Sequence, residues 1–273
     1  MTKRNNPGRT DNEEDFGFLC RRTLLFLLIA VLFPFLITGC TATTTTSGRE
    51  KAQAWEGMGR SLVIEGDLRG GLAYLLKAVE IDPENPDLNN ELALVYRDLG
   101  EYDLSLTHFK KALSLRPKFP EAENNLGTLY LLMNKWDLAI ESFNMALSDL
   151  LYKTPYFAYN NIGWAYYNKG EYEKAINSYK MALKDFPAYS PCHTNMGIAY
   201  EALGRWSEAI QAYIKSINYE PDYPPPYYRV GKLYLKQGQM NDALKAFKRF
   251  AELVKEGPEL EEVKALIRRI ENR

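Results

Sequence analysis

Few side chains in this sequence are of the types that carry out catalysis. His108 and His193 are the two histidines, and Cys192 directly precedes the second of them. Neighbouring side chains on a helix point about 100° apart, so Cys192 and His193 are not placed as a nucleophile and its base. The sequence also lacks the HExxH, CxxC, GxSxG and phosphate-loop spacings. We therefore predict no enzymatic activity, no metal site and no cofactor, and a packing role for Cys192 and His193.

Composition and charge narrow the range of partners. The 273 residues include 34 Lys and Arg against 35 Asp and Glu, and the two signs are interleaved along the chain. Because no basic stripe is present to neutralise phosphates, nucleic acid is not expected as a partner. Hydrophobic residues make up 46% of the chain, as is usual for a folded protein. The length suits either two domains or one elongated array.

The N-terminal region has the layout of an export signal. Residues 23–37 form an apolar run of 15 residues behind Arg21 and Arg22. That run is short for a membrane span, which needs roughly 20 apolar residues, and it is typical of a secretory signal peptide. It leads into LITGC at residues 36–40, which resembles the lipobox of bacterial lipoproteins. The resemblance implies removal of residues 1–39 and attachment of a diacylglycerol to Cys40.

Further predictions follow from this resemblance. Thr41 follows the lipobox cysteine in place of Asp, which by analogy with enterobacterial sorting favours the outer membrane, with the chain on its periplasmic face. With Cys20 removed and Cys40 acylated, Cys192 remains alone, so no internal disulfide forms. Residues 40–51 lack apolar periodicity and are predicted to be a flexible tether. Two alternatives stay open: an uncleaved signal anchor, and a translation start downstream of the acidic N-terminal stretch.

A small residue recurs at nearly constant spacing through the rest of the chain. It stands at Gly59, Ala93, Gly127, Gly163, Gly197 and Gly231, with intervals of 34, 34, 36, 34 and 34 residues. A bulky residue fills a second recurring position at Leu75, Phe109, Phe143, Tyr179, Tyr213 and Phe247. Apolar residues at three- and four-residue spacing within each repeat predict two amphipathic helices per repeat.

This pattern is the signature of the tetratricopeptide repeat (TPR). The resemblance covers the repeats 52–85, 86–119, 120–155, 156–189, 190–223 and 224–257. It implies an all-α TPR solenoid, in which six helix-turn-helix repeats stack into a right-handed superhelix and the small residues allow close helix approach. Residues 258–273 are predicted to be a capping helix, because Leu260, Val263, Ile267 and Ile270 lie along one stripe behind Pro258.

The turn inside each repeat has its own signature. It falls at Gly66, Gly100, Asn134, Gly170, Gly204 and Gly238. The residue that ends a helix often adopts a left-handed conformation, which glycine tolerates freely and asparagine tolerates better than most residues. We therefore predict a left-handed residue at all six positions.

The third repeat is two residues longer than its neighbours. It ends in DLLYKTP at residues 149–155, without the usual closing proline. The junction residues Ala146, Leu147, Asp149, Leu151, Tyr152 and Pro155, followed by Asn161-Ile162-Gly163, resemble those of the type IV pilus biogenesis/stability (PilF/PilW, Tgl-like) pilotin family. That resemblance implies an outer-membrane lipoprotein that helps a secretin reach, or assemble in, the outer membrane. The alternative is drift in the length of a helix–helix connection.

A binding face also follows from the TPR resemblance, since such arrays usually bind along the concave face formed by their first helices. The predicted groove residues are Asn90, Leu94, Asn124, Leu131, Phe157, Asn160, Trp164, Tyr167, Ile198 and Tyr228. Aromatic anchors in a groove suit an amphipathic helix or an extended apolar segment. Asn125, Asn161 and Asn195 share one repeat position, where their amides can either grip a partner or serve the repeat structure. Trp164 and Tyr167 can likewise pack against neighbouring repeats.

These features predict a lipid-anchored scaffold without enzymatic activity. Its predicted partner is a secretin subunit of a type IV pilus, and its predicted membrane contact is the lipid on Cys40. The alternative is a general envelope assembly scaffold that serves polysaccharide export or cell-wall enzyme complexes.

Overall fold

The computed structural model describes residues 47–272. The predicted signal peptide, the lipobox-like sequence and Cys40 lie outside the described residues, so the predictions made from them stay predictions. Within 47–272 all regular structure is helical. No helix in that range is long and apolar enough to cross a membrane.

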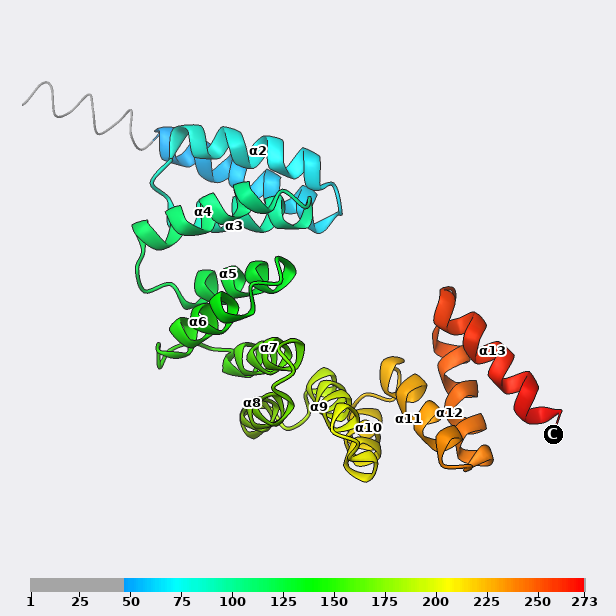
Figure 1. Ribbon diagram of the computed structural model, residues 1–273. Helices are drawn as coiled ribbons and strands as arrows, with labels where there is room; N and C mark the ends of the chain where they lie inside the picture. The colour runs from blue at the N-terminus through cyan, green and yellow to red at the C-terminus, as the bar shows by residue number, and fades with distance from the viewer. Residues whose placement is uncertain (1–46, 273) are drawn as a thin grey trace, which may run out of the picture. The chain divides into compact units, whose positions relative to one another are not determined.

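The helices follow one another in pairs (Figure 1). A helix over residues 47–64 pairs with α2 (Leu68–Ile81). The next pairs are α3 (Pro86–Asp98) with α4 (Tyr102–Leu115), α5 (Pro120–Leu132) with α6 (Trp136–Leu147), α7 (Pro155–Asn168) with α8 (Tyr172–Asp185), α9 (Ser190–Ala202) with α10 (Trp206–Tyr219), and α11 (Pro225–Lys236) with α12 (Met240–Leu253). A final helix, α13 (Pro258–Glu271), follows the last pair. The described residues thus contain the six predicted helix-turn-helix units and the predicted final helix.

The chain divides into two compact units between Pro83 and Glu84. The described part of the first unit is the first helix pair, and the second unit contains the remaining five pairs and α13. The first helix already begins at residue 47, so residues 47–51 are helical and not part of a flexible tether. Helix-favouring Arg49, Glu50 and Lys51 and the buried Ala52 extend the helix toward the N-terminus.

The predicted contact between small and aromatic residues holds each helix pair of the second unit together. A Cβ atom added to Gly231 would lie 2.6 Å from Cε1 of Phe247, and one added to Gly197 would lie 2.5 Å from Cε1 of Tyr213. Both rings are completely buried. The absence of a side chain at the glycine therefore lets the second helix place its ring directly against the backbone of the first.

The predicted left-handed residues are confirmed at all six turns. Positive φ angles of 91°, 82°, 57°, 78°, 70° and 76° occur at Gly66, Gly100, Asn134, Gly170, Gly204 and Gly238. At the second turn the N–H of Glu101 donates to the Tyr96 carbonyl at 2.8 Å, as expected where a left-handed residue closes a helix.

Successive repeats of the second unit pack mainly through the second helix of one repeat and the first helix of the next. Each second helix contacts the first helix of the next repeat, and α3, α5, α7 and α9 also approach one another directly. Successive second helices lack an equally close approach. The first helices therefore line the inner side of the stack, where we call their exposed residues the inner strip.

Candidate protein-binding surfaces

The groove residues predicted from the sequence all lie on first helices, and some of them are exposed on the inner strip. Phe157 near the start of α7 is 39% exposed, and Leu132 at the end of α5 is 49% exposed. Leu94, Leu131 and Ile198 are half-buried between neighbouring helices. Apolar side chains are thus accessible along this face, but most of them also support the packing of the repeats.

Trp164 and Tyr167 form the aromatic centre of the inner strip. Their rings stack at a centroid distance of 5.2 Å with 14° between their planes, and both residues are half-buried. Tyr172 of α8 lies against Tyr167 at 5.4 Å. The pair is therefore held in place from one side and open on the other, which is the arrangement of a rigid aromatic anchor.

Asparagine side chains of the first helices join neighbouring repeats. The amide of Asn125 on α5 donates to Oδ1 of Asn90 on α3 at 3.2 Å. The amide of Asn195 on α9 donates to Oδ1 of Asn160 on α7 at 3.0 Å, and Asn160 is 7% exposed. These amides are used within the array, which is the structural role that the sequence left open for asparagine.

The two remaining groove residues lie at less open places. Oδ1 of Asn124 is buried without a hydrogen-bond partner among the described residues. The Tyr228 hydroxyl donates to Glu262 of α13 at 2.6 Å, and its ring packs against Phe250. Tyr228 is therefore engaged with the final helix and is not an open anchor.

The junction after α6 exposes apolar surface that sequence reasoning missed. Here the two extra residues shorten the second helix to 12 residues, whereas α4, α8 and α10 each have 14. Oδ1 of Asp149 accepts from the N–H of Leu151 at 2.8 Å, and Tyr152 is buried. Leu150 and Leu151 are 98% and 85% exposed. In the sequence, two adjacent leucines in the irregular DLLY junction were the signal that could have indicated this exposed apolar surface.

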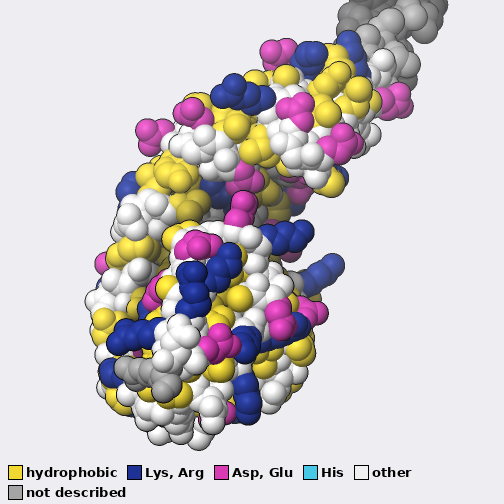
Figure 2. All heavy atoms as spheres, turned by 90° about the vertical axis from the view of Figure 1, so that its right-hand side faces the viewer, with side chains coloured by type: hydrophobic (Ala, Val, Ile, Leu, Met, Phe, Trp, Pro, Cys, Tyr) yellow, Lys and Arg dark blue, Asp and Glu magenta, His cyan; other side chains and the backbone are white. Residues whose placement is uncertain are grey.

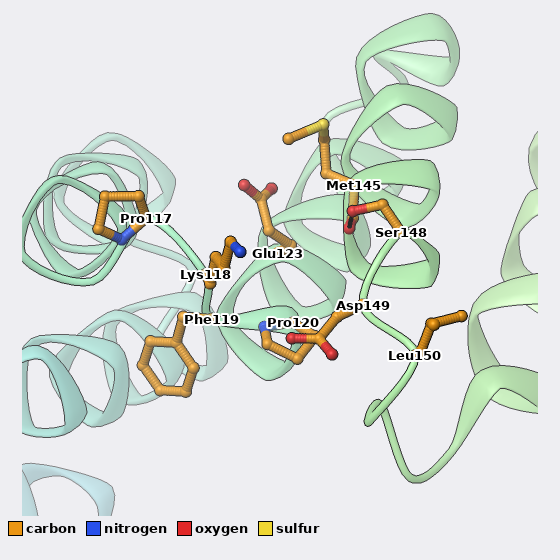
Figure 3. A pocket seen from close by; sticks show the side chains of 9 residues that line it. All are labelled: Pro117, Lys118, Phe119, Pro120, Glu123, Met145, Ser148, Asp149 and Leu150. Atoms are coloured by element: carbon orange, nitrogen blue, oxygen red, sulfur yellow. Dashed lines mark hydrogen bonds between the residues drawn. The ribbon is translucent and has the colours of Figure 1, made fainter.

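A cavity of about 560 Å³ lies beside this junction. Figure 3 shows that it is bounded by the α4–α5 connection, α5, the end of α6 and the start of the junction. Phe119, Met145 and Leu150 give it an apolar lining, while Glu123 points into it. Burial and the charge of Glu141 raise the pKa of Glu123. The junction therefore combines exposed leucines with a recess, as interaction surfaces commonly do.

The charged residues near the C-terminal end are mostly engaged in ion pairs. Lys232 lies 3.2 Å from Glu262, Lys248 lies 2.7 Å from Glu271, and Arg249 lies 2.6 Å from Asp222. Figure 2 shows basic and acidic side chains intermingled on this face. The charge of Lys232 is therefore balanced locally by Glu262.

Cys192 and His193 confirm the predicted packing role. The Cys192 thiol is fully buried and donates to the Tyr179 carbonyl at 3.5 Å, and burial raises its pKa. Nε2–H of His193 donates to the Pro187 carbonyl at 2.9 Å. The two side chains thus bond to different partners and form no dyad. Within residues 47–272, no group of three or more His, Cys, Asp or Glu side chains could hold a metal ion.

Comparisons with family models agree with the repeat assignment. Models described as tetratricopeptide repeat match residues 52–85, 84–150 and 227–254, and a model described as TPR repeat matches residues 163–204 and 199–238. No curated protein matches the chain. The predicted all-α TPR solenoid is confirmed.

Solved structures with a similar fold include PilW, PilF and MamA. PilW, titled a widely conserved type IV pilus biogenesis factor, is 22% identical with a TM-score of 0.71, over 78% of this chain and 98% of PilW. PilF from Pseudomonas aeruginosa is 19% identical with a TM-score of 0.68, over 80% and 99% of the two chains. MamA is 25% identical with a TM-score of 0.54, over 63% and 93%. The similarity to PilW and PilF concerns the fold.

Proposed function

Because this chain is a tetratricopeptide-repeat protein, a class of generally non-catalytic scaffolds that bind other proteins, we propose that it is a pilotin. In this proposal the protein is anchored in the outer membrane by lipid on Cys40 and holds a secretin subunit of a type IV pilus. The repeats then supply the binding surface, and the acyl chains supply the membrane attachment.

The observation that most directly supports a binding function is that apolar surface is exposed on a well-packed array of repeats. The stacked Trp164 and Tyr167 are half-exposed on the inner strip, and Leu150 and Leu151 are almost fully exposed at the junction. Large apolar side chains in water are unfavourable unless a partner covers them. Because such a partner would bury them, both surfaces favour capture of an apolar or amphipathic segment.

Three features support a secretin as that partner. The fold extends over nearly all of PilW and PilF. The junction at residues 149–155 resembles that of the pilotin family, and the LITGC sequence resembles a lipobox. No single one of these names a secretin, but a pilotin requires the anchor and the binding array together.

Capture of the secretin from detergent-solubilised envelope tests this proposal. The full chain is compared with a Trp164→Ala, Tyr167→Ala variant of the inner strip and a Leu150→Ser, Leu151→Ser variant of the junction. Trp206→Ala, which removes a half-buried tryptophan from the second helix α10, is the matched control. We expect the secretin to co-purify with the full chain and with Trp206→Ala, and to be lost from the inner-strip variant.

The outcomes test separately whether the secretin is the partner and whether the inner strip is the surface that binds it. If only the junction variant loses the secretin, the partner is correct and the inner strip is the wrong surface. If no secretin is captured by the full chain, the pilotin proposal fails and an envelope scaffold for other complexes takes its place.

A Cys40→Ala variant tests the lipid anchor. In this variant secretin multimers should fail to reach the outer membrane while the repeats stay folded.

A further inference from the structure

A second recess lies on the opposite side of the repeats from the inner strip. It has a volume of about 710 Å³ and is formed by α8, α9 and α10. The first helix α9 contributes His193 and Tyr200, and the two second helices contribute lysines and Tyr219. The recess is thus built by the fourth and fifth repeats together, at the groove between successive second helices.

Three lysines and no carboxylate line this recess. Lys180 and Lys184 come from α8, and Lys215 comes from α10. All three are exposed, and none makes an ion pair within the described residues. Asp185 and Glu220 follow closely in the sequence but do not line the recess. In a chain with a net charge of −1, this is a local excess of positive charge that attracts an acidic ligand.

The wall of the recess is aromatic. The Tyr219 ring, 51% exposed, stacks on His193 at 5.4 Å with 15° between the planes. Since Nε2–H of His193 donates to the Pro187 carbonyl, Nδ1 is an acceptor, and it has no partner among the described residues. Burial and the charge of Lys215 lower the pKa of this imidazole. The recess therefore offers cations, an exposed ring and a buried acceptor that lacks a donor.

The repeat fold itself does not require His193, Lys184 or Lys215 at their positions. The cavity in Figure 3 occupies the corresponding place two repeats earlier, where Glu123 stands at the position of His193 and Met145 at that of Lys215. Each correspondence follows from the shared repeat register, since Glu123 and His193 both lie four residues before the small residue of the first helix. The second and third repeats carry Ser114 and Met145 at the positions of Lys184 and Lys215, so the repeat fold does not require a lysine at either place.

We propose that this recess binds an acidic, extended segment of a partner protein. Carboxylates of the segment pair with Lys180, Lys184 and Lys215, and an aromatic or apolar side chain packs on Tyr219. Lys184 and Lys215 lie on two successive second helices, so an extended chain in the groove between those helices can contact both of them. The inference goes beyond the pilotin proposal and holds for any partner with such a segment.

Binding of a defined peptide tests this inference. The full chain is embedded in phosphatidylcholine nanodiscs and titrated with a fluorescent peptide in which glutamates flank one tyrosine. We expect binding that weakens about tenfold or more in a Lys180→Glu, Lys184→Glu, Lys215→Glu variant, since exposed charge pairs each contribute modestly and here act together. Tyr219→Ala should weaken binding several-fold, and added salt should weaken it as well.

Matched controls distinguish binding in the recess from an effect of the overall charge of the protein. A Lys110→Glu, Lys135→Glu, Lys153→Glu variant changes the net charge equally at exposed lysines outside the recess, and it should bind the peptide almost like the unaltered chain. Equal weakening in both variants would overturn the proposal, as would equal binding of a peptide with glutamines in place of glutamates. Displacement of the peptide by short-chain phosphatidylglycerol at similar concentrations would assign the recess to lipid headgroups instead. None of these results depends on whether a secretin is captured.

Discussion

The side-chain amide of Asn195 donates a 3.0 Å hydrogen bond to Oδ1 of Asn160, and this bond links the first helices of two consecutive repeats. Asn160 is buried, so Asn195→Ala leaves a buried acceptor without its donor. We expect a loss of about 1–3 kcal/mol in unfolding free energy, measured by urea denaturation of the full chain in detergent. Hydrogen exchange should increase in α7 and α9 first, because repeats are stabilised by their nearest neighbours.

The Asn160→Ala, Asn195→Ala double variant completes this test. It should cost less than the sum of the two single changes, because the second removal no longer strands a polar group. The exposed Asn177 on α8 provides a control whose replacement by alanine should leave stability nearly unchanged. Strictly additive effects at Asn160 and Asn195 would contradict the linkage.

Gly197→Ala should destabilise the fifth repeat by overpacking. The new Cβ would lie 2.5 Å from Cε1 of Tyr213, whose ring is completely buried. Moving such a ring typically costs about 1–3 kcal/mol, and thermal unfolding should show a lower Tm. A Gly197→Ala, Tyr213→Leu variant provides a smaller partner for the new methyl group. If the single change left the Tm unaffected, the close approach of the helices would be in doubt.

Substitutions at Gly170 should change stability through backbone conformation alone, without a side-chain clash. Its φ is +78°, and a Cβ there would meet nothing within 4 Å. Gly170→Ala should therefore cost about 1–2 kcal/mol through left-handed strain, and Gly170→Asn should cost less, since Asn134 occupies the same turn position with a φ of 57°. Equal losses for the two variants in urea denaturation would contradict this explanation.

Stability should decline in alkaline solution. Burial raises the pKa values of Cys192, Tyr179 and Tyr213, so these groups stay protonated in the folded chain while the unfolded chain ionises near its ordinary values of about 8.5 and 10. The folded state then binds more protons, and its stability is complete below about pH 8 and falls as the pH rises further. Urea titrations between about pH 7 and pH 10.5 measure this slope, which Cys192→Ala should reduce near pH 9.

In the junction after α6, Tyr152 should contribute to the stability of the fold and Leu150 should not. Tyr152 is 7% exposed and packs in the core of the third and fourth repeats, so Tyr152→Ala should cost about 3 kcal/mol. Leu150→Ser should change stability by no more than about 0.5 kcal/mol, because that side chain is 98% exposed. Comparable destabilisation by both changes would show that Leu150 is buried in solution.

The repeat architecture was predictable because its determinants are local. The turn at Asn134 and the contact between Gly197 and Tyr213 each depend on the residue types within a single repeat. The partners of the inner strip were less predictable. Helical periodicity places Asn160 and Tyr228 on one face, but it cannot show that Asn195 and Glu262 of the next elements already bond to them.

The surfaces outside the first helices were not predicted at all. The lysine recess combines Lys184 with Lys215 from a different repeat, and neither residue is unusual in its own helix. At the junction, the sequence shows an irregular connection, but which of Leu151 and Tyr152 is buried depends on packing against neighbouring helices. Such features arise between repeats, so they require the stacked arrangement to be known.

The contact between Tyr228 and Glu262 has a consequence for the length of the array. It spans 34 residues, and the asparagine contacts at Asn90 and Asn160 each span 35. The final helix α13 therefore stands where the first helix of another repeat would stand, as a half-unit that covers the last pair. An additional repeat inserted before Pro258 would pack on the sixth repeat through its first helix, and α13 would pack on the inserted repeat in the same way. The number of repeats, and with it the extent of partner that can be bound, can thus change without a new terminal structure.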